Sequence, residues 1–260
     1  MRLDVYLTEQ GKAESRARAK RLIESGAVLL DGIVIDRPAA EVKGTPEITV
    51  RAERFVGRGG EKLEAALTLF GVDPTGLRAL DIGASTGGFT DCLLQNGAAR
   101  VVALDAGCGQ LHPRLLADPR VINIEKYNAR ALSADDVGEA ELVVMDVSFI
   151  SQTYILPRIP AVLSKGGRVI TLIKPQFEAG RGALNKKGIV KSPRDRLLAV
   201  KRVLSAAAEC GLTCRGLAPS PILGGDGNKE YLAYFGSGDG VDSIPEHSIE
   251  KTVLEGAIMR

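Results

Sequence analysis

Two ionisable residues stand directly after apolar segments that are typical of buried β-strands. Asp146 follows residues 142–145, and Lys174 follows residues 169–173. Because the carboxyl ends of parallel strands meet at one edge of a sheet, where ligands bind, we expect both side chains at that edge. A lysine in a buried or charge-paired setting can serve as a general base. The pair is therefore a candidate acid–base site, and the alternative is an ordinary surface ion pair.

A glycine-rich turn, Gly-Ala-Ser-Thr-Gly-Gly at residues 83–88, follows the predicted strand 80–82. Small residues there let a ligand approach the backbone closely, and neither the dinucleotide-binding nor the P-loop glycine pattern is present. Asp105 ends the next predicted strand, where it can accept hydrogen bonds from both hydroxyls of a ribose. A glycine-rich turn followed by an acid at the end of the next strand, with no cation to bind a phosphate, predicts a nucleoside ligand that carries no phosphate. S-adenosyl-L-methionine is the obvious ligand of this kind. The alternatives are a structural turn cap at Asp81 and a solvated acid at Asp105.

The predicted cofactor site draws on the turn and on the ends of three strands. Asn128 is expected to touch the adenine, although a plain loop residue is an equal alternative, and residues 146–149 are expected to wall off the adenine and the substrate. The predicted cofactor-binding residues are Asp81, Gly83, Ser85, Thr86, Gly87, Gly88, Phe89, Asp105, Asn128 and Asp146. No metal site is predicted.

The order of apolar strands and amphipathic helices predicts an α/β fold, with an open, mostly parallel, Rossmann-like sheet and helices on both faces. The domain is expected at residues 59–238, after a linker at 51–58 and before a tail at 239–260 in which 248–259 form a short helix. Further expected strands are 101–104, 121–124 and 230–235, and expected helices are 89–95, 110–116, 152–163 and 193–209.

The near-neutral charge of the chain, 34 basic against 32 acidic residues, hides an uneven distribution. The first 62 residues carry the whole excess, which concentrates between Lys12 and Arg21 on a predicted helix capped by Ser15 and ended by Gly26. Strands are expected at 27–30, 33–35 and 48–50, the first two joined by an Asp-Gly turn. Such a cluster is either a solvated helix face or a site for a phosphate backbone.

Residues 1–50 closely resemble the α-L RNA-binding domain (ribosomal protein S-four-like) in three segments, 3–7, 15–23 and 26–32. The resemblance implies that the basic helix faces structured RNA. The predicted RNA-binding residues are Lys12, Arg16, Arg18, Lys20, Arg21 and Arg58. A glycine-rich loop with Phe177, Lys186, Lys187 and Lys191 either closes on RNA or is simply solvated.

Five motifs in order resemble the TlyA family (haemolysin A-like), which joins this RNA-binding domain to an FtsJ-like 2′-O-methyltransferase domain. They are Arg-Gly-Gly-Glu-Lys-Leu at 58–63, residues 81–90, Asp-Val-Ser-Phe-Ile-Ser at 146–151, Leu-Ile-Lys-Pro-Gln-Phe-Glu at 172–178, and Gly-Asn-Lys-Glu-Tyr at 227–231. One departure is Gly57, where the family usually has serine.

The resemblance implies a Rossmann-like methyltransferase sheet of seven strands, and a catalytic tetrad of Lys62, Asp146, Lys174 and Glu230. Lys174 would deprotonate or polarise a ribose 2′-hydroxyl, and Asp146 would orient Lys174 near the methyl donor. Lys62 and Glu230 would position the ribose and the lysine pair. Each residue taken alone is more ordinarily a surface ion-pair partner, but four matching motifs favour the catalytic interpretation.

The implied function is S-adenosylmethionine-dependent 2′-O-methylation of a cytidine ribose in 16S and/or 23S ribosomal RNA, within ribosomal subunits or their precursors. One alternative is a haemolysin-like membrane-active protein, against which the sequence shows no export signal and no membrane-spanning apolar run. The other is an RNA-binding protein with an inactive methyltransferase fold. We expect a cytoplasmic protein with four free cysteines and neither a DNA nor a membrane partner.

Overall fold

The structure is a computed structural model, whose contacts divide the chain into two compact units, Met1–Arg54 and Phe55–Arg260. The division falls within the stretch 51–58 that we expect to be a linker. The side chains of Arg21 and Glu24 are not described. The described residues are 1–24, 26–50, 54–224, 227–237 and 243–258.

The first unit packs two helices against a small antiparallel sheet. Helix α1 spans Leu3–Glu9 and α2 spans Arg16–Glu24. The strand order is β2-β1-β3, with β1 at Val28–Leu30, β2 at Ile33–Val34 and β3 at Ile48–Val50. The apolar stripe of α2 forms the core with α1 and β1. The core residues are Leu3, Leu7, Ala13, Ala19, Leu22, Ile23, Val28 and Val42.

Local signals in the sequence account for the ends of these elements. The Oγ of Ser15 accepts a hydrogen bond from the N–H of Arg18 at 3.2 Å, which confirms the predicted helix cap. Asp31 and Gly32 both have positive φ, +49° and +78°, as the tight hairpin turn between β1 and β2 requires. The cap and the apolar side of the basic helix thus hold it in place, and of its described cations Arg16 and Lys20 are exposed and Arg18 is half-buried.

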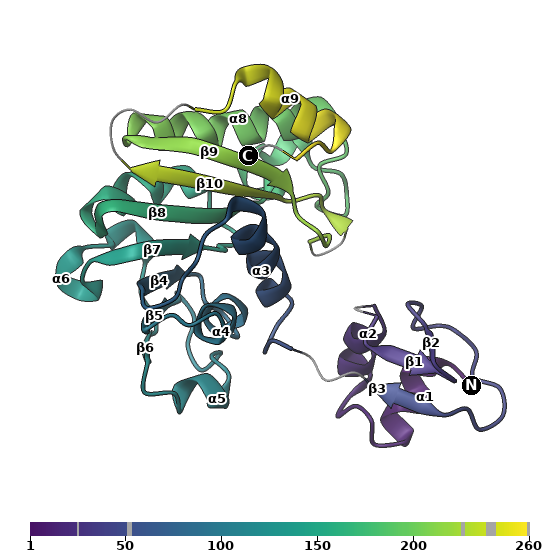
Figure 1. Ribbon diagram of the computed structural model, residues 1–260. Helices are drawn as coiled ribbons and strands as arrows, with labels where there is room; N and C mark the ends of the chain where they lie inside the picture. The colour runs from purple at the N-terminus through teal and green to yellow at the C-terminus, as the bar shows by residue number, and fades with distance from the viewer. Residues whose placement is uncertain (25, 51–53, 225–226, 238–242, 259–260) are drawn as a thin grey trace. The chain divides into compact units, whose positions relative to one another are not determined.

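The second unit contains, in its described part, a seven-stranded sheet in the order β6-β5-β4-β7-β8-β10-β9 (Figure 1). Strands β6, β5, β4, β7 and β8 are parallel, and β10 runs antiparallel to both β8 and β9. This confirms the predicted mostly parallel sheet. The strands are β4 Arg78–Ile82, β5 Arg100–Leu104, β6 Val121–Ile124, β7 Ala140–Met145, β8 Leu163–Ile173, β9 Leu212–Pro219 and β10 Tyr231–Ser237.

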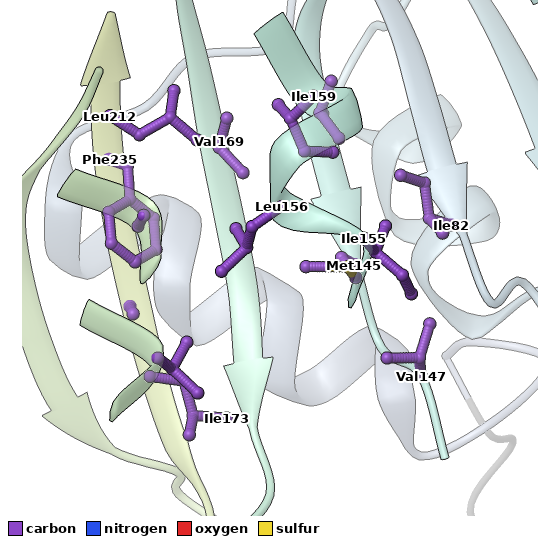
Figure 2. Packing of buried hydrophobic residues seen from close by; sticks show 14 of the residues in the cluster. Ile82, Met145, Val147, Ile155, Leu156, Ile159, Val169, Ile173, Leu212 and Phe235 are labelled. Carbon is purple, nitrogen blue, oxygen red and sulfur yellow. The ribbon is translucent and has the colours of Figure 1, made fainter. Parts of the chain in front are cut away.

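Helices cover both faces of this sheet. On one face α3 and α4 pack on a buried apolar cluster, and on the other α8 packs on a second cluster that Figure 2 shows between β10, β8, β7 and the segment of Ile155, Leu156 and Ile159. The helices are α3 Gly59–Phe70, α4 Gly88–Gln95, α5 Pro113–Leu116, α6 Ala134–Val137, α7 Pro175–Glu178, α8 Pro193–Glu209 and α9 Glu246–Glu255. Short 3₁₀ helices are η1 Ala129–Ala131, η2 Gln152–Tyr154, η3 Leu156–Ala161 and η4 Arg181–Ala183.

Four elements differ from the sequence predictions in type or by three or more residues at one end. Strand β8 begins at Leu163, not at residue 169. Helix α5 begins at Pro113, not at residue 110, because a residue before proline avoids the helical region and His112 is extended. The predicted helix at 152–163 is instead η2 and η3, since prolines in this segment lack the N–H that an α-helix needs. The tail helix α9 ends at a left-handed Gly256, short of the expected residue 259, which lies outside the described residues.

Candidate active site

The carboxyl ends of β7 and β8 bring Asp146 and Lys174 together. The two strands pair up to Met145 and Thr171, so the residues that follow them emerge side by side. The Nζ of Lys174 lies 2.6 Å from the Oδ1 of Asp146 and donates a hydrogen bond to the Oγ of Ser148 at 2.8 Å. Lys174 is buried, so two oxygen partners hold its ammonium group at a fixed point of the sheet edge.

A second ion pair joins Lys62 to Glu230. Lys62 lies in the first turns of α3 and Glu230 immediately precedes β10, whose Tyr231 pairs with Ile173 of β8. The Nζ of Lys62 lies 2.5 Å from the Oε2 of Glu230, and both side chains are at least nine-tenths buried. The other carboxylate oxygen of Glu230 accepts a hydrogen bond from the Nε2 of Gln176 at 3.3 Å.

The two ion pairs line one cavity of about 300 Å³. Lys62, Asp146, Lys174 and Glu230 all reach it, together with the exposed Arg58 at the start of α3. The structure therefore brings together the four residues predicted as a tetrad, from α3 and from the ends of three strands. Their catalytic roles remain a prediction, because a short distance between side chains does not show that they act on a substrate.

The buried Lys62–Glu230 pair gives a prediction that separates stability from activity. Glu230→Ala leaves the Lys62 ammonium buried without its partner, which we expect to lower the free energy of unfolding by about 3–5 kcal/mol. The double variant Lys62→Met/Glu230→Leu removes both charges and should recover most of that loss while staying inactive. Urea unfolding and methyl-transfer assays measure the two effects. Equal stability of the single and double variants would contradict the expectation.

The glycine-rich turn packs tightly against the loop after β7. Gly83 has φ +86°, and a Cβ there would lie 2.8 Å from the carbonyl oxygen of Asp146. Gly87, with φ +96°, is the N-cap of α4, and a Cβ there would collide with Leu115. Only glycine fits these two places, so the turn needs its glycines for conformation and for close approach.

Asp105, which follows the neighbouring strand β5, also holds the glycine-rich turn in place. One carboxylate oxygen accepts a hydrogen bond from the N–H of Ser85 at 2.8 Å, and the other accepts one from the N–H of Gly107 at 2.7 Å. Each oxygen keeps a further lone pair for a ligand hydroxyl. The geometry fits the predicted ribose contact and also shows a structural role that the sequence did not reveal.

A cavity of about 400 Å³ opens between this turn and the loop after β7. Of the predicted cofactor residues it is lined by Gly83, Ser85, Asp105, Asn128 and Asp146. Thr86, Gly88 and Phe89 line the tetrad cavity, and Gly87 lines neither of the two. Both cavities share Gly83, Ser85, Asp146 and Ser148, so they adjoin at the Asp146–Lys174 pair.

Asp81 lies beneath the turn and lines neither cavity. Its side chain is fully buried, and its Oδ2 accepts a hydrogen bond from Thr90 at 2.7 Å. Its buried Oδ1 has no hydrogen-bond partner among the described residues. Burial, reinforced by the negative charges of Asp146 and Asp105, raises the pKa of Asp81 from 3.8 to about 7. Direct contact with a cofactor stays a prediction for this residue.

The raised pKa of Asp81 predicts an unusual pH dependence of stability. The unfolded chain loses this proton near pH 4 and the folded chain only near pH 7, so stability falls as pH rises through that window. Between pH 5 and 8 the wild type should lose about 2–3 kcal/mol that Asp81→Asn does not lose, because asparagine stays neutral. Urea unfolding at several pH values measures this. Parallel curves for the two proteins would refute it.

The predicted RNA-binding residues occupy both units. Lys12, Arg16 and Lys20 are exposed and Arg18 is half-buried, whereas the Arg21 side chain lies outside the described residues. Arg16 also donates a hydrogen bond to the Oδ2 of the buried Asp4 at 3.0 Å, so it has a structural role in its own unit.

The glycine-rich loop after β8 carries exposed lysines at 186, 187 and 191. The buried Asn228 holds this loop, since its Nδ2 donates to the carbonyl of Gly188 at 3.1 Å and its Oδ1 accepts from Val190 at 3.3 Å. Both interpretations of the loop, RNA contact and solvated surface, remain compatible with this arrangement.

Sequence reasoning did not predict two of the contacts at this site, although Ser148 belongs to the segment 146–149 that was expected to line it. Ser148 is a direct partner of Lys174, and Gln110 lines the larger cavity, where its Oε1 accepts a hydrogen bond from the Oγ of Ser85. Ser148 stands two residues after Asp146 in the same strand-end loop, which was the available signal. Gln110 belongs to a segment that we expected to be helical, so its approach to the turn had no local signal.

A mostly parallel sheet whose next-to-edge strand, β10, runs antiparallel to its neighbours, with a cavity at its glycine-rich turn, is the architecture typical of Rossmann-like methyltransferases. Residues 55–237 match the FtsJ-like methyltransferase family, and residues 1–48 match the S4 domain. The chain thus belongs to the FtsJ-like methyltransferases of the TlyA group, as the five motifs predict.

Relatives along most of the chain support this assignment. The 16S/23S rRNA (cytidine-2′-O)-methyltransferase TlyA of Mycobacterium tuberculosis H37Rv is 43% identical over 90% of this chain and 89% of its own length. Hemolysin A of Brachyspira hyodysenteriae is 43% identical over 90% of this chain and 99% of its own. A solved structure from Streptococcus thermophilus, provisionally named a hemolysin, has 40% identity and a TM-score of 0.77, covering 98% of this chain and 94% of its own.

Two of these relatives carry the name hemolysin. None of the helices in the described parts of the chain has both the length and the apolar character needed to cross a membrane.

Proposed function

We propose that this protein methylates the 2′-hydroxyl of a cytidine ribose in ribosomal RNA, with S-adenosyl-L-methionine as the methyl donor. One observation carries the proposal: the Lys174–Asp146 pair lies where a nucleoside-sized cavity meets the cavity of the Lys62–Glu230 pair. The similarity to TlyA supports the rRNA substrate and the cytidine. A ribosomal substrate implies that the protein works in the cytoplasm.

The described residues of the larger cavity fit a nucleoside cofactor. Gly83 and Ser85 leave the backbone open to a ligand, and Asp105 keeps lone pairs for the two ribose hydroxyls. Asn128 lies on the same wall, where its side chain can meet the adenine. When bound, S-adenosylmethionine supplies a methyl group on a positively charged sulfur.

The neighbouring ion pairs provide the chemistry that a ribose hydroxyl needs. A 2′-hydroxyl is a weak acid, so its oxygen becomes a good nucleophile only when its proton is taken up or polarised. We assign this role to Lys174, which polarises the hydroxyl when it is an ammonium ion and can take up the hydroxyl proton only as a neutral amine; Asp146 and Ser148 hold its Nζ in place. Lys62 and Glu230 position the ribose, and alignment of its oxygen with the methyl carbon supplies much of the rate.

Two further features support an RNA substrate. The first unit offers the basic helix α2, whose exposed cations suit a phosphate backbone. At the cavity mouth Phe149 is 92% exposed and its ring lies 5.1 Å from that of Phe177. Exposed aromatic rings are suited to stack on unpaired bases, as sequence-specific RNA recognition requires.

Transfer of a tritiated methyl group to purified ribosomal subunits tests the proposal. Small and large subunits that lack the modification are incubated separately with the protein, and the labelled nucleotide is located in 16S or 23S RNA. We expect label on a cytidine 2′-oxygen, and no lysis of erythrocytes by the same preparation. Cofactor binding without any transfer to either subunit would instead favour an RNA-binding protein with an inactive methyltransferase fold.

A further inference from the structure

We propose that Glu178 is a positioning residue for this reaction, because its carboxylate ties the loop that carries Asp146 to the segment that carries Lys174. The inference rests on the proposed function, since it concerns the geometry of the same pair. We call residues 146–151 the Asp146 loop. Glu178 is the last residue of α7, which begins directly after Lys174.

The Asp146 loop needs an anchor. It supplies both described oxygen partners of Lys174, Asp146 and Ser148, yet it forms no regular helix or strand. At its centre Phe149 has φ +64°, a left-handed conformation that costs a non-glycine residue on the order of 1–3 kcal/mol. Such strain persists only where surrounding contacts enforce it.

Glu178 provides that anchor at the far end of the loop. One carboxylate oxygen accepts a hydrogen bond from the Oγ of Ser151 at 2.5 Å, and the other accepts one from the N–H of Gln152 at 2.8 Å. The carboxylate is buried, and burial raises the pKa of Glu178 although both hydrogen bonds act to lower it. Both carboxylate oxygens therefore bind the end of the Asp146 loop.

Gln152, the residue after the Asp146 loop, connects this end of the loop to the sheet. Its side chain is buried, and its Nε2 donates a hydrogen bond to the carbonyl of Leu172, two residues before Lys174. The segment of Lys174 is thus joined to the Asp146 loop on both sides, at Leu172 and at Glu178. Arg202 of α8 donates to the carbonyl of Glu178 at 3.1 Å and fixes the end of α7 in turn.

These contacts set the distance between Asp146 and Lys174, on which the proposed chemistry depends. Backbone pairing between β7 and β8 ends at Met145 and Thr171, before Asp146 and Lys174. Beyond that point each segment keeps backbone bonds to another strand, Asp146 to Ile82 of β4 and Ile173 to β10, but the described contacts between the two segments run through side chains. Without Glu178 the Asp146 loop is free to relax from its strained form. A shift of about 1 Å at a reacting group is enough to reduce a rate by about 10²-fold.

The test compares two substitutions at the same position. Glu178→Ala removes both hydrogen bonds, whereas Glu178→Gln can accept from Gln152 and donate to Ser151. We expect alanine to lower kcat by about 10²-fold with KM for RNA and cofactor within about threefold, and glutamine to stay within about threefold of wild type. Hydrogen exchange of residues 147–152, followed by mass spectrometry, should be faster in the alanine variant and near wild type in the glutamine variant.

Two further variants test whether a loss of activity is specific to the contacts of Glu178. Val253→Ala destabilises the core at α9 without touching the tie, and should leave kcat unchanged. If Glu178→Ala does not fold, Ser151→Ala removes one of the two hydrogen bonds to Glu178, together with the contacts of Ser151 to Thr153 that cap η2, and should reduce kcat in the same direction. A wild-type kcat in Glu178→Ala or Ser151→Ala, or a loss in Val253→Ala equal to theirs, would overturn the positioning role. Absence of transfer by the wild type would instead contradict the proposed function.

Discussion

A Lys174→Ala protein should fold and bind its cofactor but lose about 10³-fold or more in methyl-transfer rate, because general acid–base groups contribute roughly 10²–10⁴-fold. Its partner Asp146 keeps a 20% exposed side chain, so water can solvate the carboxylate left behind. Single-turnover transfer of a radiolabelled methyl group measures the rate, and equilibrium binding measures the cofactor. Lys165→Ala, an exposed lysine on the same strand β8, is the matched control.

A Lys174→Arg variant distinguishes the two roles proposed for the lysine, which are removal of the hydroxyl proton and polarisation of the hydroxyl. Arginine keeps the positive charge but does not give up its proton, so it can polarise a hydroxyl and cannot act as a base. An inactive arginine variant therefore supports proton removal, and an arginine variant that keeps part of the rate supports polarisation. An alanine variant that retains a tenth or more of the wild-type rate would rule out both roles.

Removal of three cations from the first unit should weaken RNA binding without changing the chemical step. In the variant Lys12→Gln/Arg18→Gln/Lys20→Gln we expect affinity for ribosomal subunits to fall about 10–100-fold at moderate salt. The slope of log affinity against log salt should shrink by about 2–3, because each phosphate contact contributes a little under one unit. Arg16 stays unchanged, since it also holds Asp4. The rate at saturating RNA should remain near that of the wild type.

The control for this prediction removes the same charge from the other unit. Arg158→Gln/Lys165→Gln/Lys251→Gln replaces three exposed cations there. Equal weakening by both triple variants would mean that net charge alone governs binding, and the predicted role of the basic helix would then be wrong. Filter binding at four or five salt concentrations supplies both the affinity and the slope.

The residues at strand ends were predictable because one physical rule places them. A polar residue that follows an apolar strand of a parallel sheet emerges at the carboxyl edge, and this rule alone predicts that Asp146 and Lys174 lie close together. Motif resemblance added Lys62 and Glu230, for which spacing alone gave no partner. The sequence also predicted the glycine turn and the basic helix with its Ser15 cap.

Contacts made by tertiary packing were beyond such reasoning. Glu178 is an ordinary acid one helical turn after a proline, and only the fold shows that its carboxylate meets Ser151 and Gln152. The seventh strand, β9, lacked a predicted range because its residues, Leu-Thr-Cys-Arg-Gly-Leu-Ala-Pro, carry a weak strand signal. Its strand form depends on pairing with β10.

The position of β10 has a consequence for how the chain reaches its active form. This strand comes after β9 in the sequence but lies between β8 and β9, so β9 meets the sheet only through a later segment. The Lys62–Glu230 pair spans 168 residues and closes when β10 arrives. Contacts so distant in sequence form slowly. A growing chain on the ribosome therefore cannot bring the four residues of the predicted tetrad together until β10, the last strand among the described residues, has been synthesised. If the tetrad is catalytic as proposed, activity requires that this final part of the sheet has folded.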